Sequence, residues 1–110
     1  MDRLYKGYKV WAYNPEDEAG SERKPMCKVG LKDGKLWMIP GNISEEEMRR
    51  FLGMRFRGEN GEIITKDSDP EAYLYRLLGY FRQNSYLRYR KIEIPETELE
   101  DAVVVDGKES

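Results

Sequence analysis

DPEAYLYRLLGYFRQNSYLRYRKIEI, residues 69–94, is the stretch that decides the fold. Its first half has apolar residues at the spacing i, i+3, i+4 and i+7, which is typical of one side of an α-helix, at Leu74, Leu77, Leu78 and Phe81. Asp69-Pro70 suits the start of that helix, because the residue before a proline is extended and proline favours the first helical position. We predict a helix over residues 70–83, a turn at Asn84-Ser85 and a long strand over residues 86–94.

The apolar alternation changes side within the predicted strand. Leu87 and Tyr89 share one parity, whereas Ile92 and Ile94 share the other. Strict alternation cannot bury both pairs on one face. Two interpretations stay open, namely a β-bulge near residues 90–91 or a strand that is covered on both faces.

Upstream, Asp33-Gly34 predicts a hairpin with a two-residue turn, because both turn positions need a positive φ. Such a turn fixes the register, and the expected pairs are Leu31 with Leu36, Val29 with Met38, and Gly30 with Trp37. The indole of Trp37 should then lie over the bare backbone of Gly30.

Asn60-Gly61 predicts a second hairpin of the same kind, with Arg57 opposite Ile64 and Phe56 opposite Thr65. In this register one side carries Met54, Phe56, Ile63 and Thr65. The other side carries Arg55, Arg57, Ile64 and Lys66.

The rest of the chain divides into three parts. Residues 8–13 alternate as a strand, and residues 15–25 lack periodicity and are expected to form a loop. Ser44 begins a short helix with a capping box formed with Glu47, and Gly53 suits its end.

The predicted fold class is therefore α+β: a single small domain, residues 1–95, with a twisted, mostly antiparallel sheet of five or six strands. One short and one long helix pack on this sheet. Residues 96–110 form an acidic C-terminal tail, expected to lack order over 96–101 for want of an apolar anchor. Residues 103–105 are three valines that could add a strand to an open sheet edge.

Charge is unevenly distributed along the 110 residues, although the net charge is only −2. Residues 48–91 carry 10 Lys/Arg and 5 Asp/Glu, whereas residues 92–110 carry 1 and 7. A basic middle is thus followed by an acidic end. We expect the tail to fold back on the basic strand 88–91 and to compete there with an anionic ligand.

Several classes of protein are disfavoured by composition. No apolar run is long enough to span a bilayer, no signal peptide is recognisable, and Cys27 is the only cysteine. We therefore expect a cytoplasmic protein without a membrane partner. Abundant charge with a single glutamine, Gln83, is typical of thermophile proteins.

Catalytic and metal sites are not indicated. Histidine is absent, so the usual zinc ligands and the usual base of a nucleophilic triad are missing. Asp67, Asp69 and Glu71 resemble the start of a calcium loop, but Ala72 stands where such a loop needs glycine. We predict a non-catalytic protein with no metal and no cofactor.

Arginine and tyrosine are interleaved through residues 73–91, as in proteins that stack bases and neutralise phosphates. Gly79 interrupts the polar side of the helix, which suggests that a ligand, a second helix or a loop approaches closely. We predict a small binding module for single-stranded nucleic acid or RNA. The alternative is a protein-interaction or homodimerisation module that uses the same surface. The candidate binding residues are Arg55, Arg57, Tyr75, Arg76, Gly79, Arg82, Tyr86, Arg88, Arg90 and Lys91. One continuous patch of these arginines would favour nucleic acid, whereas scattered arginines would contradict the nucleic-acid interpretation.

Overall fold

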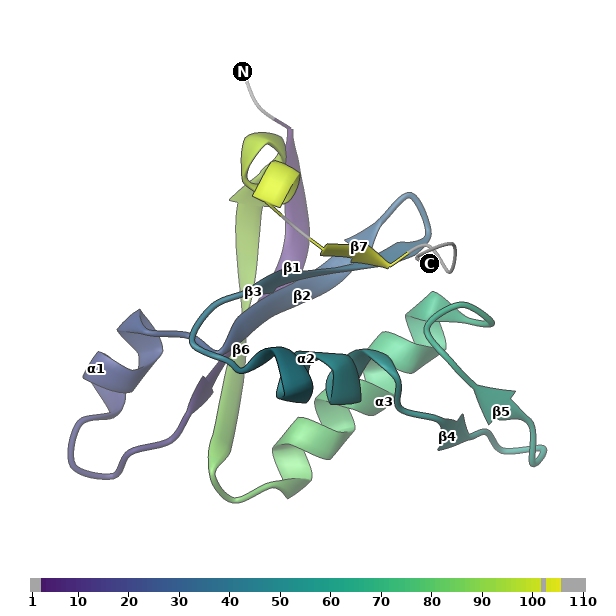
Figure 1. Cartoon of the computed structure of the whole chain (residues 1–110), viewed down its shortest axis with the longest axis horizontal. Coiled ribbons are helices and arrows are strands. Elements are labelled where there is room, and N and C mark those ends of the chain that lie inside the picture. The colour runs from purple at the N-terminus through teal and green to yellow at the C-terminus, as the bar shows by residue number, and fades with distance from the viewer. Residues whose placement is uncertain (1–2, 102, 106–110) are drawn as a thin grey trace.

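The computed structural model describes residues 3–101 and 103–105. Figure 1 shows a twisted sheet with helices on both sides, which confirms the predicted α+β fold. In chain order the elements are β1 (Leu4–Ala12), α1 (Glu18–Arg23), β2 (Cys27–Lys32), β3 (Lys35–Pro40), α2 (Glu45–Leu52), β4 (Phe56–Arg57), β5 (Ile63–Ile64), α3 (Pro70–Gln83), β6 (Leu87–Pro95), the 3₁₀-helix η1 (Glu96–Asp101) and β7 (Val103–Val105).

The main sheet has the strand order β6-β1-β2-β3-β7, and every neighbouring pair is antiparallel. Strands β4 and β5 form a separate two-stranded hairpin. No helix in the described part of the chain is long and apolar enough to cross a membrane.

The β2–β3 hairpin has the predicted turn and register. Asp33 and Gly34 have φ values of 54° and 78°, as a type I′ turn requires. Gly30 pairs with Trp37 on β3 and with Gly7 on β1. A Cβ at Gly30 would lie 2.5 Å from Cζ2 of Trp37, and one at Gly7 would lie 2.8 Å from Cη2. The indole of Trp37 therefore lies over the backbone of two adjacent strands. It covers Gly30, as predicted, and also Gly7.

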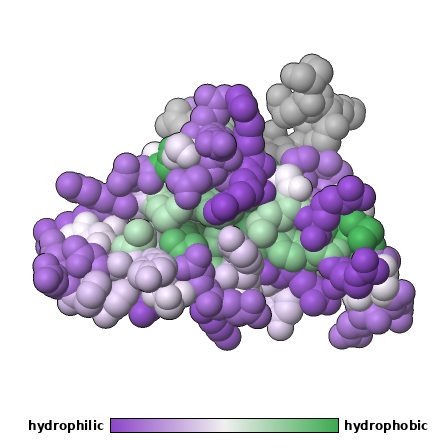
Figure 2. Space-filling view, turned by 60° about the horizontal axis from the view of Figure 1, so that its bottom comes forward, coloured by the Kyte–Doolittle hydropathy of each residue, from purple (hydrophilic) through white to green (hydrophobic). Residues whose placement is uncertain are grey.

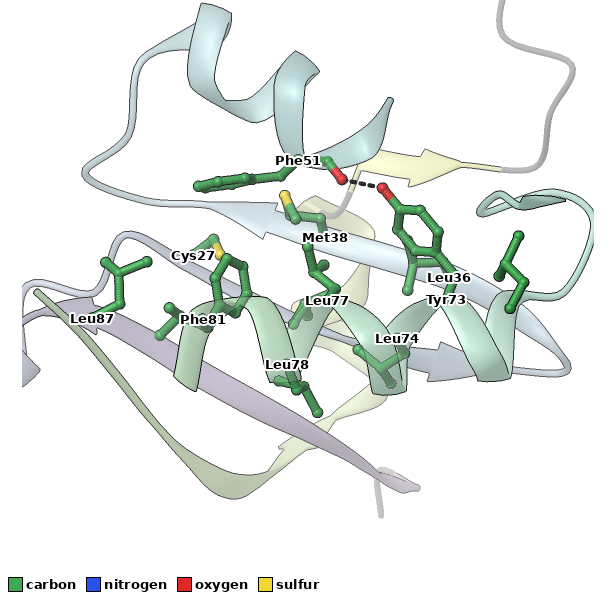
Figure 3. Close-up of a cluster of buried hydrophobic side chains, with 13 residues drawn as sticks. Cys27, Leu36, Met38, Phe51, Tyr73, Leu74, Leu77, Leu78, Phe81 and Leu87 are labelled. Atoms are coloured by element: carbon green, nitrogen blue, oxygen red, sulfur yellow. Dashed lines mark hydrogen bonds between the residues drawn. The ribbon is translucent and has the colours of Figure 1, made fainter. Parts of the chain in front are cut away.

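The main core lies between the sheet and helices α2 and α3 (Figure 3). The predicted apolar side of α3 is buried: Leu77 and Phe81 are fully covered, and Leu74 and Leu78 nearly so. Tyr73 joins this core, and its hydroxyl donates to the backbone carbonyl of Phe51 at the end of α2. Burial raises the pKa of Tyr73 to about 12. This tyrosine ties α3 to α2 inside the core.

Strand β6 is covered on both faces and has no bulge. Its register with β1 runs unbroken from Leu87 opposite Ala12 to Pro95 opposite Leu4. Leu87 packs in the main core on the helix side, and Ile94 packs in a second core with Trp37 on the opposite side. The change of parity thus marks a change in which face of the strand is buried, and the bulge interpretation is wrong.

The register predicted for the second hairpin is wrong by one residue. Phe56 pairs with Ile64, and the N–H of Gly58 donates to the carbonyl of Glu62, so the loop has three residues rather than two. The carbonyl of Gly58 accepts from the N–H of Gly61 inside this loop. Only Gly61 in this loop has a positive φ, of 82°. That geometry matches a type I turn followed by a left-handed glycine. Because a slip of one residue exchanges the faces, Ile64 is buried and Ile63 is exposed.

The predicted loop over residues 15–25 contains a helix, α1. Asp17 caps it by accepting the backbone N–H of Gly20 at 3.0 Å. Six residues with a central glycine show no apolar periodicity, so sequence alone gave no helical signal. Tertiary contact with the sheet, through Glu22, supports this short element.

The described part of the acidic tail is ordered, contrary to expectation for residues 96–101. Leu99 of η1 is buried beside Trp37 and Ile94, so it supplies the apolar anchor that the prediction overlooked. Strand β7 pairs with β3 over Leu36–Met38, which confirms the predicted added strand. Residues 106–110 lie outside the described residues.

The tail acids bind a different basic surface from the predicted one. Lys28 Nζ lies 2.6 Å from Glu98 Oε2, and Lys32 Nζ lies 3.2 Å from Glu96 Oε2. The hydrogen bond that Lys32 donates to Glu96 raises the pKa of Lys32. For Glu96 and Glu98, the expected contact with residues 88–91 is therefore wrong.

Candidate nucleic-acid interface

A groove lies between the solvent side of α3 and the helix-side face of β1 and β6. Its volume is about 550 Å³, within the range of small-ligand sites. Five aromatic side chains, three basic ones and no carboxylate are among the lining residues, which are Tyr8, Phe56, Tyr75, Arg76, Leu78, Gly79, Tyr80, Arg82, Gln83, Tyr89 and Lys91.

The sheet side of this groove is formed by alternate residues of β1 and β6, whose side chains point to the same face. Tyr8 on β1 lies opposite Lys91 on β6, and Val10 lies opposite Tyr89. Val10 is buried under the helices, so Tyr8, Tyr89 and Lys91 share its face. The rings of Tyr8 and Tyr89 meet edge to face, with centroids 5.8 Å apart. This pair fixes an aromatic surface beside α3.

The helix wall is linked to the sheet wall by Arg82. Its Nη2 donates to the hydroxyl of Tyr89 at 2.9 Å, and its guanidinium carbon lies 5.8 Å from the centre of the same ring. A hydrogen bond to the hydroxyl holds Arg82 in place without neutralising its charge. Tyr75, about two turns earlier on α3, is 77% exposed and is held by no ring contact in the described residues.

Gly79 lies on the groove side of α3 between these side chains. A Cβ built there has no atom within 4 Å in the described chain. No described loop of the chain therefore explains this glycine. The glycine lowers helix stability and leaves open space on the groove side of α3.

The basic groups of the groove have no acidic partner among the residues that the structure describes. Within the described part of the chain, Arg76, Arg82 and Lys91 form no ion pair. The protein as a whole has a net charge of −2, so a groove lining without a carboxylate differs in charge from the protein as a whole. Three basic side chains and no carboxylate give the groove lining a local excess of positive charge.

Two of the predicted binding residues lie on the other face of the sheet. Arg90 Nε lies 2.6 Å from Glu22 Oε2, and Lys9 Nζ lies 3.1 Å from the same oxygen. The hydrogen bond from Arg90, with a second from Lys9, lowers the pKa of Glu22. Arg88 stacks on Tyr13, with its guanidinium carbon 4.0 Å from the ring centre. Arg88 and Arg90 are therefore separated from the groove by the sheet itself.

The remaining predicted residues lie outside the groove as well. Arg55 and Arg57 are exposed on the segment around β4, and Arg57 donates to the carbonyl of Gly61. Tyr86 is 73% exposed and lines a second hollow, near α2 and the end of β1. The six arginines of the predicted patch thus do not form one continuous surface, which is the outcome expected to count against nucleic acid on the arginine criterion alone. The groove brings together Tyr75, Arg76, Gly79, Arg82 and Lys91.

Sequence reasoning did not include Tyr8, Phe56, Tyr80 and Tyr89 among the binding residues. Their place in the groove depends on the β1–β6 pairing and on where α3 crosses the sheet. The alternation along residues 8–13 placed Tyr8 and Val10 on the same face of a strand, but it did not show which helix packs beside them. Figure 2 shows one face of the molecule, on which hydrophobic residues form a band between hydrophilic ones.

Comparison with known proteins gives no further guide. The chain matches no protein-family model, no curated protein sequence and no solved structure. Among the described residues, no group of three or more His, Cys, Asp or Glu side chains could hold a metal ion.

Proposed function

We propose that this protein is a small non-catalytic module that binds single-stranded nucleic acid, RNA or DNA, in the groove beside α3. The observation that carries the proposal is the lining of five aromatic and three basic side chains without a carboxylate. Bases stack on aromatic rings whatever their sequence, and cations beside those rings neutralise the phosphates. A cytoplasmic location, where RNA is abundant, is part of the same proposal.

Each part of the groove has a role in this proposal. Tyr75, which projects from α3, is the platform for one base, and the Tyr8–Tyr89 pair offers a second aromatic surface. Arg76, Arg82 and Lys91 neutralise the backbone between the stacked bases. The open space over Gly79 lets the sugar–phosphate chain approach the helix closely.

A protein partner is the second candidate. Exposed tyrosine and arginine are enriched at protein interfaces, and Gly79 leaves room for a helix to pack against α3. Binding of a protein partner would depend more on hydrophobic contact than on phosphate charge. The two candidates therefore predict a different dependence of affinity on ionic strength. A partner helix should bind with little dependence on ionic strength, whereas nucleic acid should be released by salt.

The direct test is fluorescence anisotropy with labelled single strands of about 12 nucleotides, which is within the span of small single-strand binding folds. Tyr75→Ala should weaken binding by about fivefold to a hundredfold, the range expected for one lost stacking contact. Arg23→Ala, which removes an exposed arginine on α1 outside the groove, serves as the matched control and should leave affinity unchanged. Equal losses in the two variants would contradict the proposed site.

A further inference from the structure

Among the described residues, the outer edge of β6 is paired with no strand, and on its outward backbone Arg88 Nη1 donates to the carbonyl of Leu87 at 3.0 Å. Strand β6 is the last in the sheet order, and no described strand pairs with its outer side. Backbone bonds at both ends, Tyr13 N–H to Tyr86 and Glu96 N–H to Arg3, show that even-numbered residues bond toward β1. Because hydrogen-bonded pairs alternate along an antiparallel ladder, the odd-numbered residues direct their backbone groups outward.

The residues of β6 that direct their backbone outward carry charges that can pair with those of a second copy of the strand. Two copies related by a two-fold axis perpendicular to the sheet would pair their β6 strands antiparallel and keep their helices on one side. With the axis at Ile92, Lys91 of each copy lies opposite Glu93 of the other, so two opposite-charge pairs form. Arg90 then lies opposite Ile94, and no like charges meet.

Neighbouring registers do not share this property. An axis at Lys91 places two lysines opposite each other, one at Arg90 places two arginines, and one at Glu93 places two glutamates. An axis at Tyr89 sets Arg88 against Arg90. Like charges directly opposite one another destabilise a strand pair. The pattern thus favours the register centred on Ile92.

We propose that two copies of this chain associate through their β6 edges in the register centred on Ile92, forming one continuous antiparallel sheet. In that register Lys91 of one copy and Glu93 of the other form backbone hydrogen bonds, because both residues direct their N–H and C=O outward. Their side chains, which carry opposite charges, lie opposite each other as well. Pro95 has no N–H, but its carbonyl accepts from Tyr89. The pairing does not depend on the proposed function.

The dimer has a consequence for the groove. Tyr89 and Lys91 form part of the groove wall, and their backbone forms the edge. A two-fold axis perpendicular to the sheet keeps both grooves on the same face, next to one another. If the grooves bind nucleic acid as proposed, the dimer offers a longer basic and aromatic track than one copy.

Charge reversal tests the register in the full chain without any nucleic acid. In sedimentation velocity over a range of protein concentrations, the wild type should show reversible dimerisation. Glu93→Lys or Lys91→Glu alone should raise the dimer dissociation constant about tenfold or more, because both cross-strand pairs become repulsive. The double variant K91E/E93K should restore it. Lys35→Glu, an exposed charge reversal on β3, is the control and should dimerise like the wild type. A monomer at every concentration, or a double variant as weak as the singles, would overturn the proposal.

Cross-linking tests the same register by distance. Ile92→Cys places two thiols at the axis, in a non-hydrogen-bonded pair whose Cα atoms are about 4.5 Å apart, close enough for a disulfide. Arg90→Cys places them about 14 Å apart along the strands. Oxidation should link the first variant and not the second, and buried Cys27 should not interfere. Equal linking, or linking of Arg90→Cys alone, would contradict the register.

Discussion

Two glycines have opposite surroundings, although both lie in regular elements. Gly30 is covered by Trp37 and by the carbonyl of Lys6, whereas Gly79 faces open space in the groove. Gly30→Ala should lower the free energy of unfolding by about 1–3 kcal/mol, because the backbone and the packed indole cannot move aside. Urea titration followed by tryptophan fluorescence measures this change.

Gly79→Ala is the matched variant with the opposite sign. An alanine in the middle of α3 should stabilise the protein by about 0.5–1 kcal/mol, since it restricts the unfolded chain and meets no atom. The same methyl group lies where a ligand backbone is proposed to approach. A more stable variant with weaker nucleic-acid binding would support a functional glycine, and unchanged binding would argue against close approach there.

Cys27 makes stability depend on pH at the alkaline end. Burial raises the pKa of its thiol from 9.0 to about 12, because the folded protein disfavours the thiolate. Between these values the folded state holds more protons than the unfolded state, so stability should fall as pH rises above 9. The expected slope is about 1.4 kcal/mol per pH unit at most. Cys27→Ala should lose this component, and urea midpoints for both proteins at pH 8–11 would show it.

At the scale of elements, α3 joins the core on one side and the groove on the other. Leu77 is fully buried, whereas Tyr75 projects into solvent. Leu77→Ala should cost about 2–5 kcal/mol of stability. Tyr75→Ala should change stability by less than about 0.5 kcal/mol, as surface substitutions usually do. A loss below about 1 kcal/mol for Leu77→Ala would contradict the packing of α3.

The C-terminal elements belong to the sheet rather than to a free tail. Figure 1 shows η1 on the opposite side of the sheet from α2 and α3, with β7 at the β3 edge. Truncation after Pro95 should therefore lower stability, because it exposes Trp37 and Ile94 and leaves the β3 edge unpaired. Truncation after Val105 retains these contacts and should keep that stability. Thermal unfolding of the two truncated proteins decides between a structural and a solubilising role.

Local chemistry made some elements predictable. Asp33-Gly34 fixed one register, and the spacing of Leu74 to Phe81 fixed the buried side of α3. The register predicted from Asn60-Gly61 was wrong because this dipeptide also fits a three-residue loop. In that loop Gly61 is the only residue that needs a positive φ. The groove was only half predictable. Five of its residues were named from α3 and β6, but Tyr8 of β1 reaches the groove through a pairing with Lys91 that spans more than 80 residues of sequence.

The whole molecule separates its charges by face. On the side of the sheet opposite the groove, Glu22, Glu96 and Glu98 pair with nearby cations. In the groove, three cations have no carboxylate partner among the described residues. This asymmetry is hidden by the net charge of −2 and by the scatter of arginines along the chain. If the groove binds nucleic acid as proposed, this asymmetry would direct the ligand to one side of the protein.

The salt dependence of single-strand binding tests the central proposal most directly. Three phosphate contacts should give a slope of about −2 for the logarithm of the association constant against the logarithm of salt concentration. Arg82→Ala should reduce the magnitude of that slope by about 0.7, and Arg23→Ala should leave it unchanged. Binding that is absent at low salt, or a slope that Arg82→Ala does not alter, would contradict a nucleic-acid site in the groove.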